Sequence, residues 1–340
     1  MRVCIVIDDI RYPLDEGFKN AISSIVFELR KLHEVLVVGK NIETELGQCL
    51  CRNRMLLGFR IWRTIRDFQP EKTIYLPMSS LTVGGVLRGK ILKLYSHSCV
   101  VLVGFQPRTY GKLARHILPA LKPDKLFVQS QRSLSKFKAM GMDGRVLPSG
   151  VDLSKFYPVG LPNRLGLRQK YGLPLSDKII LHVGHLNRSR GIDLLVGLVA
   201  KGILPVLVTS TSTDGDLAYL TELRQKGIHV ITDYLADIQE IYQLADAYVF
   251  PTKQNSSAIE FPLSVLEALA CGVPVLATRF GGLTSFFEDC LWFRFIDGLD
   301  DARKYLPELL EIEESDRRSM RTFVEEFFSW QAVSARLLVD

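Results

Sequence analysis

The sequence predicts a two-domain α/β protein, in which each domain is built on a parallel sheet flanked by helices. Short apolar runs of strand length alternate with helical stretches along the whole chain, a pattern typical of parallel strands joined by crossover helices. With 340 residues the chain is long enough for two hydrophobic cores. Residues 147–162 contain several prolines and glycines, interrupt the alternation and mark the predicted boundary between the domains.

The predicted strands of the first domain are short runs dominated by Val, Ile and Leu, at 3–7, 35–38, 73–76, 100–104, 125–129 and 144–147. The first strand leads into a loop at 8–17. Helical spacing of apolar residues predicts the intervening helices, at 20–32, 54–68, 87–95, 110–118 and 132–139.

The second domain repeats this alternation. Its predicted strands are at 178–184, 205–209, 229–232, 247–250 and 274–277, and its predicted helices at 191–201, 215–226, 236–244, 299–312 and from 317 onward. A capping box predicts one more short helix before the last strand, with Ser264 as N-cap and Glu267 three residues later. Gly272 suits the left-handed position after this helix, and Pro274 prevents the helix from continuing.

This short helix is the first candidate for a binding site. Its amino terminus is expected at the carboxyl edge of a parallel sheet, where nucleotides and phosphates bind. The unpaired N–H groups and the dipole of a helix start favour an anion there. We expect the backbone N–H groups of Phe261, Leu263 and Ser264, on either side of Pro262, to take part in binding.

Composition restricts the class of partner. A net charge of +6 suits an anionic substrate such as a nucleoside diphosphate, and no basic motif with interleaved aromatic residues argues for nucleic acid. No apolar run reaches the roughly 20 residues needed to cross a bilayer, and the start of the chain lacks the features of a signal peptide. The six cysteines form no pairing or zinc-binding pattern, so we expect reduced thiols and a cytoplasmic protein.

Four motifs give the sequence a resemblance to a known family. From Phe261 onward the short helix follows the pattern Phe-Gly-Leu-x-x-x-Glu-Ala, with Pro262 at the position of the glycine, and then small-Gly-x-Pro-Val. The boundary matches Pro-x-Gly-Val-Asp-x-x-x-Phe-x-Pro at Pro148, Gly150, Val151, Asp152, Phe156 and Pro158. A Tyr-x-x-Ala-Asp motif begins at Tyr242, and a Phe-Ser-Trp motif ends at Trp330. Together they resemble the retaining, nucleotide-sugar-dependent glycosyltransferases of family four, also called group one, which have the GT-B fold.

The resemblance implies two Rossmann-like α/β/α domains facing each other across a cleft. The acceptor-side domain is expected at 1–150 and the donor-binding domain at 151–327, with a terminal helix at about 328–340 packing back on the first domain. The implied reaction is the transfer of a sugar from a nucleoside-diphosphate sugar to a hydroxyl acceptor (a glycan, a lipid-linked molecule or a small molecule). The anomeric configuration is retained, and no metal or other cofactor is expected.

The chain departs from the family pattern at two of the implied donor contacts. The leading glutamate of the family falls on Ile259 and the following glycine on Glu260, so the two glutamates are one residue closer than usual. In the loop that holds the donor diphosphate, His185 and Arg190 occupy the positions of an arginine and a lysine. Arg190 suits this role because a guanidinium binds phosphate oxygens well. His185 is mostly neutral at pH 7, and Arg188 can supply the missing charge.

Further roles follow from the resemblance, each with a simpler alternative. Glu267 is expected to bind the ribose hydroxyls, or else only to cap its helix. Glu260 is expected to contact the donor sugar, or else to be an exposed loop acid. Gly17 allows close approach of backbone to the donor, or forms an ordinary turn. Contacts with the base are expected from Tyr234 and Leu235, and contacts with the acceptor from Gln106 and Arg108.

Residues 52–66 carry five arginines and no acid. The simplest interpretation is a crossover helix that buries a stripe of Met55, Phe59, Trp62 and Ile65 and leaves the arginines in solvent. The alternative is a peripheral contact with anionic lipid at the inner membrane face, which would suit a lipid-linked acceptor.

Two other classes of function remain open. A catalytically impaired relative would bind a sugar nucleotide or a partner protein without turnover, and Ile259 and His185 favour it. A sugar-nucleotide 2-epimerase would share the fold. A nicotinamide-linked enzyme is disfavoured because no G-x-G-x-x-G follows any predicted strand.

Overall fold

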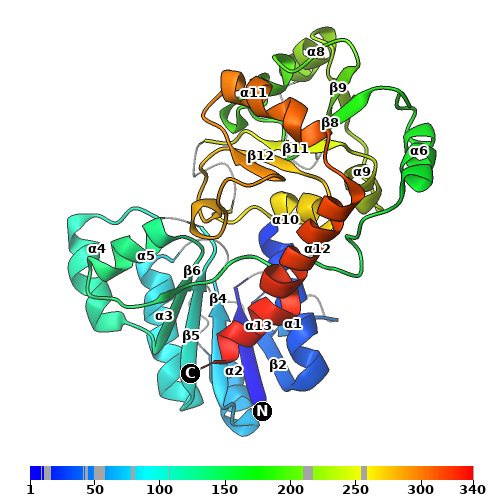
Figure 1. Cartoon of the computed structure of the whole chain (residues 1–340). Coiled ribbons are helices and arrows are strands. Elements are labelled where there is room, and N and C mark those ends of the chain that lie inside the picture. The colour runs from blue at the N-terminus through cyan, green and yellow to red at the C-terminus, as the bar shows by residue number, and fades with distance from the viewer. Residues whose placement is uncertain are drawn as a thin grey trace. The chain divides into compact units, whose positions relative to one another are not determined.

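The computed structural model describes residues 1–8, 10, 17–40, 42, 45–49, 58–77, 81–106, 108–209, 217–253 and 259–339. The chain divides into two compact units, each with one parallel sheet flanked by helices (Figure 1). Unit 1 comprises Met1–Gly150, Ile259–Phe261 and Trp330–Asp340, and unit 2 comprises Val151–Ala258 and Pro262–Ser329. The short excursion of the chain into unit 1 at 259–261 has no counterpart in the sequence-based expectation.

The sheet of unit 1 has seven strands in the order β3-β2-β1-β4-β5-β6-β7, all parallel. These strands are β1 (Arg2–Ile7), β2 (Glu34–Gly39), β3 (Gln48–Cys49), β4 (Lys72–Leu76), β5 (Cys99–Gly104), β6 (Lys125–Val128) and β7 (Arg145–Val146). After Arg2, every residue of β1 is fully buried, which explains its uninterrupted apolar run. A parallel strand covered on both faces by helices needs such a sequence.

The helices of unit 1 are α1 (Gly17–Leu32), α2 (Phe59–Phe68), α3 (Val83–Ser96), α4 (Lys112–Ile117), α5 (Gln131–Lys138) and α13 (Trp330–Leu338), with a 3₁₀ turn at Leu118–Leu121. Helix α13 packs against α1, and the Lys125 ammonium group donates to the carbonyl of Val339 at 2.7 Å. A Cβ atom on Gly150 would lie 2.5 Å from the indole ring of Trp330, so the chain passes too close to this ring for any larger residue.

Helix α2 differs from the expected stripe. It buries Ile61 and Ile65, while Trp62 stacks on Tyr95 with ring centroids 4.0 Å apart. Phe59, expected on the buried stripe, is 76% exposed. The helix is described from Phe59, and Met55 with the rest of 50–57 lies outside the described residues.

The sheet of unit 2 has six strands in the order β10-β9-β8-β11-β12-β13, also all parallel. They are β8 (Lys178–Val183), β9 (Ile203–Val208), β10 (His229–Ile231), β11 (Ala247–Phe250), β12 (Val275–Ala277) and β13 (Phe293–Phe295). The helices are α6 (Leu161–Lys170), α7 (Asp193–Val196), α8 (Leu217–Gln225), α9 (Gln239–Gln243), α10 (Leu263–Ala270), α11 (Leu299–Leu310) and α12 (Glu314–Phe328), with 3₁₀ turns at Arg188–Arg190 and Leu283–Ser285.

Helix α6 was not predicted, and its buried face explains why. The buried residues of this helix are two arginines, Arg164 and Arg168, so the sequence carries no apolar periodicity there. Both guanidinium groups bind the carboxylate of Asp246, Arg164 at 2.8 Å and Arg168 at 2.6 Å. The same carboxylate accepts the N–H of Ile179 at 2.7 Å. Buried ionic contacts therefore hold α6 to the start of strands β8 and β11.

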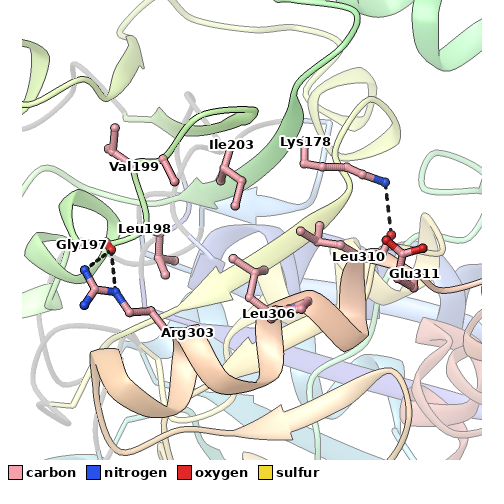
Figure 2. Close-up of a pocket in the computed structure, with 11 residues that line it drawn as sticks. Lys178, Gly197, Leu198, Val199, Ile203, Arg303, Leu306, Leu310 and Glu311 are labelled. Atoms are coloured by element: carbon pink, nitrogen blue, oxygen red, sulfur yellow. Dashed lines mark hydrogen bonds between the residues drawn. The ribbon is translucent and has the colours of Figure 1, made fainter.

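Unit 2 contains a pocket of about 470 Å³. Figure 2 shows the residues that line it. It lies at the start of β8 and β9 and along α11, and is lined by Lys178, Gly197, Leu198, Val199, Ala200, Ile203, Arg303, Leu306, Pro307, Leu310 and Glu311. Arg303 donates to the carbonyl of Gly197 at 3.1 and 2.9 Å, and Lys178 to that of Leu310 at 3.3 Å. The pocket is therefore at the amino edge of the sheet, opposite the edge where ligands of such sheets bind.

Among the helices that the structure describes, none is long and apolar enough to cross a membrane.

Candidate functional site

The loop that follows β8 is folded tightly over the carboxyl edge of the sheet in unit 2. Its 3₁₀ turn is capped by Asn187, whose side chain accepts the N–H of Ser189 at 2.8 Å. Gly191 ends the turn with φ +71°, and a Cβ atom there would lie 2.6 Å from the carbonyl oxygen of Pro251. Only glycine suits this position, because it adopts positive φ without strain and the end of β11 is too close for a side chain.

Arg190 is held inside this fold of the loop. Gly184 is the residue directly after β8, and a Cβ atom there would lie 3.1 Å from one terminal nitrogen of Arg190. Burial lowers the pKa of the Arg190 guanidinium, but an arginine remains a cation at neutral pH. The loop therefore presents a partly desolvated positive charge at the carboxyl edge of the sheet.

Tyr248 on β11 lies near both Arg190 and helix α10. Its hydroxyl lies 3.4 Å from the carbonyl of Val183 and interacts with Ser264, and the charges of Glu267 and Arg190 influence its pKa. Burial raises the pKa of this phenol, which therefore remains protonated. Arg190, Ser264 and Glu267, all expected at the donor site, thus share one buried neighbour. The sequence interpretation missed Tyr248, although it belongs to the strand that follows the Tyr-x-x-Ala-Asp motif.

The predicted capping box of α10 is wrong. The helix begins at Leu263 with Pro262 as its N-cap, and among the described residues no side chain caps it. Ser264 interacts with Tyr248, and Glu267 accepts a hydrogen bond from the Tyr242 hydroxyl at 2.6 Å. Both side chains have tertiary partners, which leaves the first N–H groups of α10 without a side-chain cap. An uncapped helix start is well suited to receive an anion. Gly272 has the expected positive φ of 70°.

Glu267 is partly buried, and its carboxylate has an unusual environment. Burial raises its pKa, while the hydrogen bond from Tyr242 and the charge of Lys155 lower it. Tyr242 binds one carboxylate oxygen, Oε2. The other oxygen has no hydrogen-bond partner in the part of the chain that the structure describes, and can accept from a ligand hydroxyl.

The remaining candidates of unit 2 occupy different environments. Arg188 is exposed, pairs with Glu222 at 2.7 Å and lies over the ring of Tyr219, so its charge is already partnered. His185 is partly buried in the same loop. Tyr234 is 81% exposed after β10, next to the partly buried Leu235.

Glu260 has partners that the sequence did not suggest. It is 2% exposed, and its carboxylate oxygen Oε1 accepts hydrogen bonds from Ser130 at 2.5 Å and Ser133 at 2.7 Å. It is therefore not the exposed loop acid of the simpler alternative. Phe261 is fully buried, and both residues belong to unit 1.

The acceptor-side candidates all lie in unit 1. Gly17 is the first residue of α1, and most of the preceding loop is outside the described residues. Gln106 is partly buried shortly after β5, and Arg108 is exposed. Asp8 accepts from the Tyr75 hydroxyl at 2.9 Å and pairs with Arg88 at 3.2 Å. The described residues contain no group of three or more His, Cys, Asp or Glu side chains arranged to hold a metal ion.

His182 on β8 is a second residue that the sequence interpretation missed. Its ring is fully buried, and Nδ1 donates to the carbonyl of Val249 at 2.9 Å. Nε2 has no hydrogen-bond partner among the described residues, and a Cβ atom on Gly184 would lie 3.1 Å from it. Burial is the main cause that lowers the pKa of His182 to about 4; the hydrogen bond to Val249 opposes this shift, and the nearby charge of Arg190 contributes to it.

This pKa predicts a pH-dependent contribution to stability. In the unfolded chain the imidazole titrates near ~6.5, so between about 4 and 6.5 the unfolded state binds a proton that the folded state does not. Lowering the pH from 7 to 4.5 is therefore expected to cost the wild type about 2–3 kcal/mol more than it costs His182→Phe. Urea unfolding of both proteins at the two pH values measures this difference. Equal losses in both proteins would show that His182 is protonated in the folded state.

Solved structures identify the fold. The crystal structure of Anabaena Alr3699/HepE in complex with UDP matches with a TM-score of 0.77 and 14% identity, over 99% of this chain and 98% of that chain. A glycosyltransferase from Rickettsia africae ESF-5 matches with a TM-score of 0.79 and 14% identity, over 99% and 97%. WaaG, a glycosyltransferase involved in lipopolysaccharide biosynthesis, matches with a TM-score of 0.65 and 14% identity, over 98% of both chains. The protein has the GT-B fold, which confirms the expected fold class.

The sequence comparison adds a family match. Residues 177–294, which lie in unit 2 apart from Ile259–Phe261, match the family Glycosyl transferases group 1. The putative teichuronic acid biosynthesis glycosyltransferase TuaC of Bacillus subtilis is 33% identical over 153 residues, 44% of this chain and 37% of that protein. A D-inositol 3-phosphate glycosyltransferase of Corynebacterium kroppenstedtii is 32% identical over 215 residues, 57% and 46%. The chain spans less than half the length of these two relatives.

Proposed function

We propose that the protein is a glycosyltransferase that moves a sugar from a nucleoside-diphosphate sugar to a hydroxyl acceptor, with retention of configuration and without a metal. The observation that carries this proposal is the junction at Tyr248, which interacts with Ser264 in the first turn of α10 and is influenced by the charge of Arg190, at the carboxyl edge of the sheet in unit 2. A fixed cation next to free helix N–H groups matches the charge of a departing diphosphate. The junction lies within the segment that matches the glycosyltransferase family.

The mechanism assigned to these groups is electrostatic. As the bond between sugar and diphosphate breaks, negative charge grows on the leaving phosphate and positive charge on the sugar. Arg190 and the N–H groups of Leu263 and Ser264 stabilise the leaving phosphate, because they are in position before the reaction begins. His185 and Arg188 contribute from the same loop. No metal is needed in this scheme, since protein groups supply the positive charge.

The other donor contacts follow from the same placement. The unoccupied carboxylate oxygen of Glu267 accepts from the ribose hydroxyls, while Tyr242 holds the carboxylate in place. Tyr234 and Leu235 contact the base mainly through their backbone. A nucleotide donor is supported by the HepE structures, which were solved with UDP and with UDP-glucose.

On the acceptor side, we assign Gly17, Gln106 and Arg108 of unit 1 to acceptor binding. Helix α2 supports a lipid-linked acceptor, because Phe59 is exposed among the exposed Arg60, Arg63 and Arg66. Such a surface favours contact with anionic lipid at the inner face of a membrane. Cys4, Cys99, Cys271 and Cys290 are free thiols, which supports a cytoplasmic location.

A binding protein without turnover is the second candidate. It is favoured by the substitution of Ile259 for the glutamate of the family pattern and by the burial of Glu260 in unit 1. These two features remove both carboxylates that would otherwise contact the donor sugar.

The deciding experiment is a panel of UDP-, GDP-, ADP- and dTDP-sugars, added in the presence of a chelator. We expect one nucleotide to raise the melting temperature of the wild type and to lose this effect with Glu267→Gln. Release of the free nucleoside diphosphate when an acceptor mixture is added would separate the transferase from the binding protein. Stabilisation by no nucleotide would overturn both candidates.

A further inference from the structure

Three residues from the second half of the sequence are built into unit 1. The chain leaves unit 2 after Ala258, contributes Ile259–Phe261 to unit 1, and returns at Pro262. Glu260 is 2% exposed and Phe261 is fully buried. Burying a carboxylate costs free energy, so a buried glutamate is expected to have hydrogen-bond partners that compensate for this cost.

The carboxylate of Glu260 is bound at the amino end of α5. Ser130 is the N-cap of this helix, and its hydroxyl accepts the N–H of Ser133 at 3.0 Å. The hydroxyls of Ser130 and Ser133 both donate to Oε1 of Glu260, at 2.5 and 2.7 Å. The positive end of the helix dipole favours an anion at this place. Burial has the largest effect and raises the pKa of Glu260, while the two serine hydroxyls and the charges of Lys136 and Arg132 partly oppose this shift.

The backbone of the same segment is bound on both sides. The N–H of Glu260 donates to the carbonyl of Phe105 at 3.1 Å, and the N–H of Phe261 donates to the side-chain oxygen of Gln129 at 3.1 Å. Ser149 donates to the carbonyl of Phe261 at 2.9 Å and accepts from Gln129 at 2.9 Å. Side chains of unit 1 thus hold the segment through its carboxylate and through consecutive backbone groups.

We propose that Glu260 is a positioning residue that fixes the start of α10, and that it does not contact the donor. We call the contacts of Glu260 and Phe261 with Ser130, Ser133, Gln129 and Ser149 the Glu260 latch. Pro262 is the N-cap of α10 and follows Phe261 directly. The latch therefore holds the chain at the point where it enters the helix whose N–H groups bind the donor in the function proposed above, on which this inference rests.

The latch is a property of this chain and not of the family pattern. The position of Glu260 is a glycine in that pattern, and a glycine has no side chain to reach α5. Oε2 of Glu260 is buried without a hydrogen-bond partner within the described residues, which costs free energy. The segment tolerates this cost because Oε1 has two donors and the helix dipole.

The first test is hydrogen exchange of the protein without any nucleotide. In Glu260→Ala, the amides of Phe261, Leu263 and Ser264 are expected to exchange at least ~10-fold faster than in the wild type, because their local opening becomes easier. Ser133→Ala is expected to act in the same direction. The double variant is expected to exchange little faster than Glu260→Ala, because the two substitutions remove the same contact. Glu308→Gln, at an exposed pair with Arg294, is the control and should leave these amides unchanged.

The second test is binding of UDP as a probe. Glu260→Ala is expected to weaken binding about tenfold, and Glu260→Gln to restore most of it, since an amide oxygen still accepts from Ser133. Unchanged exchange in both Glu260→Ala and Ser133→Ala would overturn the latch. Loss of binding or turnover with unchanged exchange would instead make Glu260 a direct contact. Because the exchange test uses no nucleotide, it decides on the latch even if UDP does not bind the wild type and the proposed function fails.

Discussion

Replacing Arg190 by alanine is expected to lower the rate of sugar transfer by about 10²–10³-fold, the usual effect of removing one preorganised group that stabilises transition-state charge. The guanidinium is partly desolvated beside Gly184 and Tyr248, so its charge acts in a medium less polar than water. Arg190→Lys is expected to recover part of the loss, because it keeps the charge without the planar pair of donors. The rate of transfer is measured for the wild type and both variants as the release of the nucleoside diphosphate under single-turnover conditions.

Arg188→Ala is the matched control, since it removes the same side chain from the same turn. Arg188 is exposed and already pairs with Glu222 at 2.7 Å, so we expect less than a ~10-fold change. A larger loss with Arg188→Ala than with Arg190→Ala would mean that Arg188 binds the diphosphate. Equal and small losses would leave the helix start of α10 as the main anion-binding group.

Replacing Asp246 by alanine is expected to lower the free energy of unfolding by about 3–5 kcal/mol, the range found when one partner of a buried ion pair is removed. The carboxylate is the shared partner of Arg164 and Arg168, and all three residues are buried. Without it, two buried guanidinium groups repel each other, and the N–H of Ile179 loses its acceptor. Urea unfolding followed by circular dichroism measures the change.

Asp67→Ala provides the comparison for an exposed pair. Asp67 lies 3.5 Å from Arg63, one turn away on α2, and both side chains are more than 60% exposed. Its removal is expected to cost less than about 1 kcal/mol. If Asp246→Ala cost no more than Asp67→Ala, then Arg164 and Arg168 would be solvated in solution and α6 would not depend on the buried charges.

Local patterns predicted the core strands well and failed where a helix lacks an apolar face. Strands such as β1 and β5 are apolar throughout, because both faces are covered, and this is visible in the sequence. Helix α6 was missed because it buries two arginines against Asp246, which lies far away in the chain. Strands β3 and β13 at the sheet edges were also missed, since β3 has only two residues and β13 only three.

For the candidate site, the sequence predicted candidate segments but not the partners of their side chains. Ser264 and Glu267 have the spacing of a capping box, yet they bind Tyr248 and Tyr242 from other elements. His182 and Tyr248 lie within strands, where a periodic pattern cannot distinguish a core residue from one that faces a ligand. Only the structure shows that both residues lie near the charge of Arg190 and that Tyr248 interacts with Ser264 of α10.

By itself the sequence determined the alternation of strands and helices, the position of the boundary near residue 150 and the motifs that resemble a glycosyltransferase family. These properties depend on short-range spacing of apolar residues, glycine and proline, and such spacing is written directly in the chain. Only the tertiary structure decided the partner of each polar group: Asp246 with α6, Glu267 with Tyr242, and Glu260 with α5. The reason is physical, since a buried carboxylate must find its donors among all residues that folding brings near it, and these are distant in sequence.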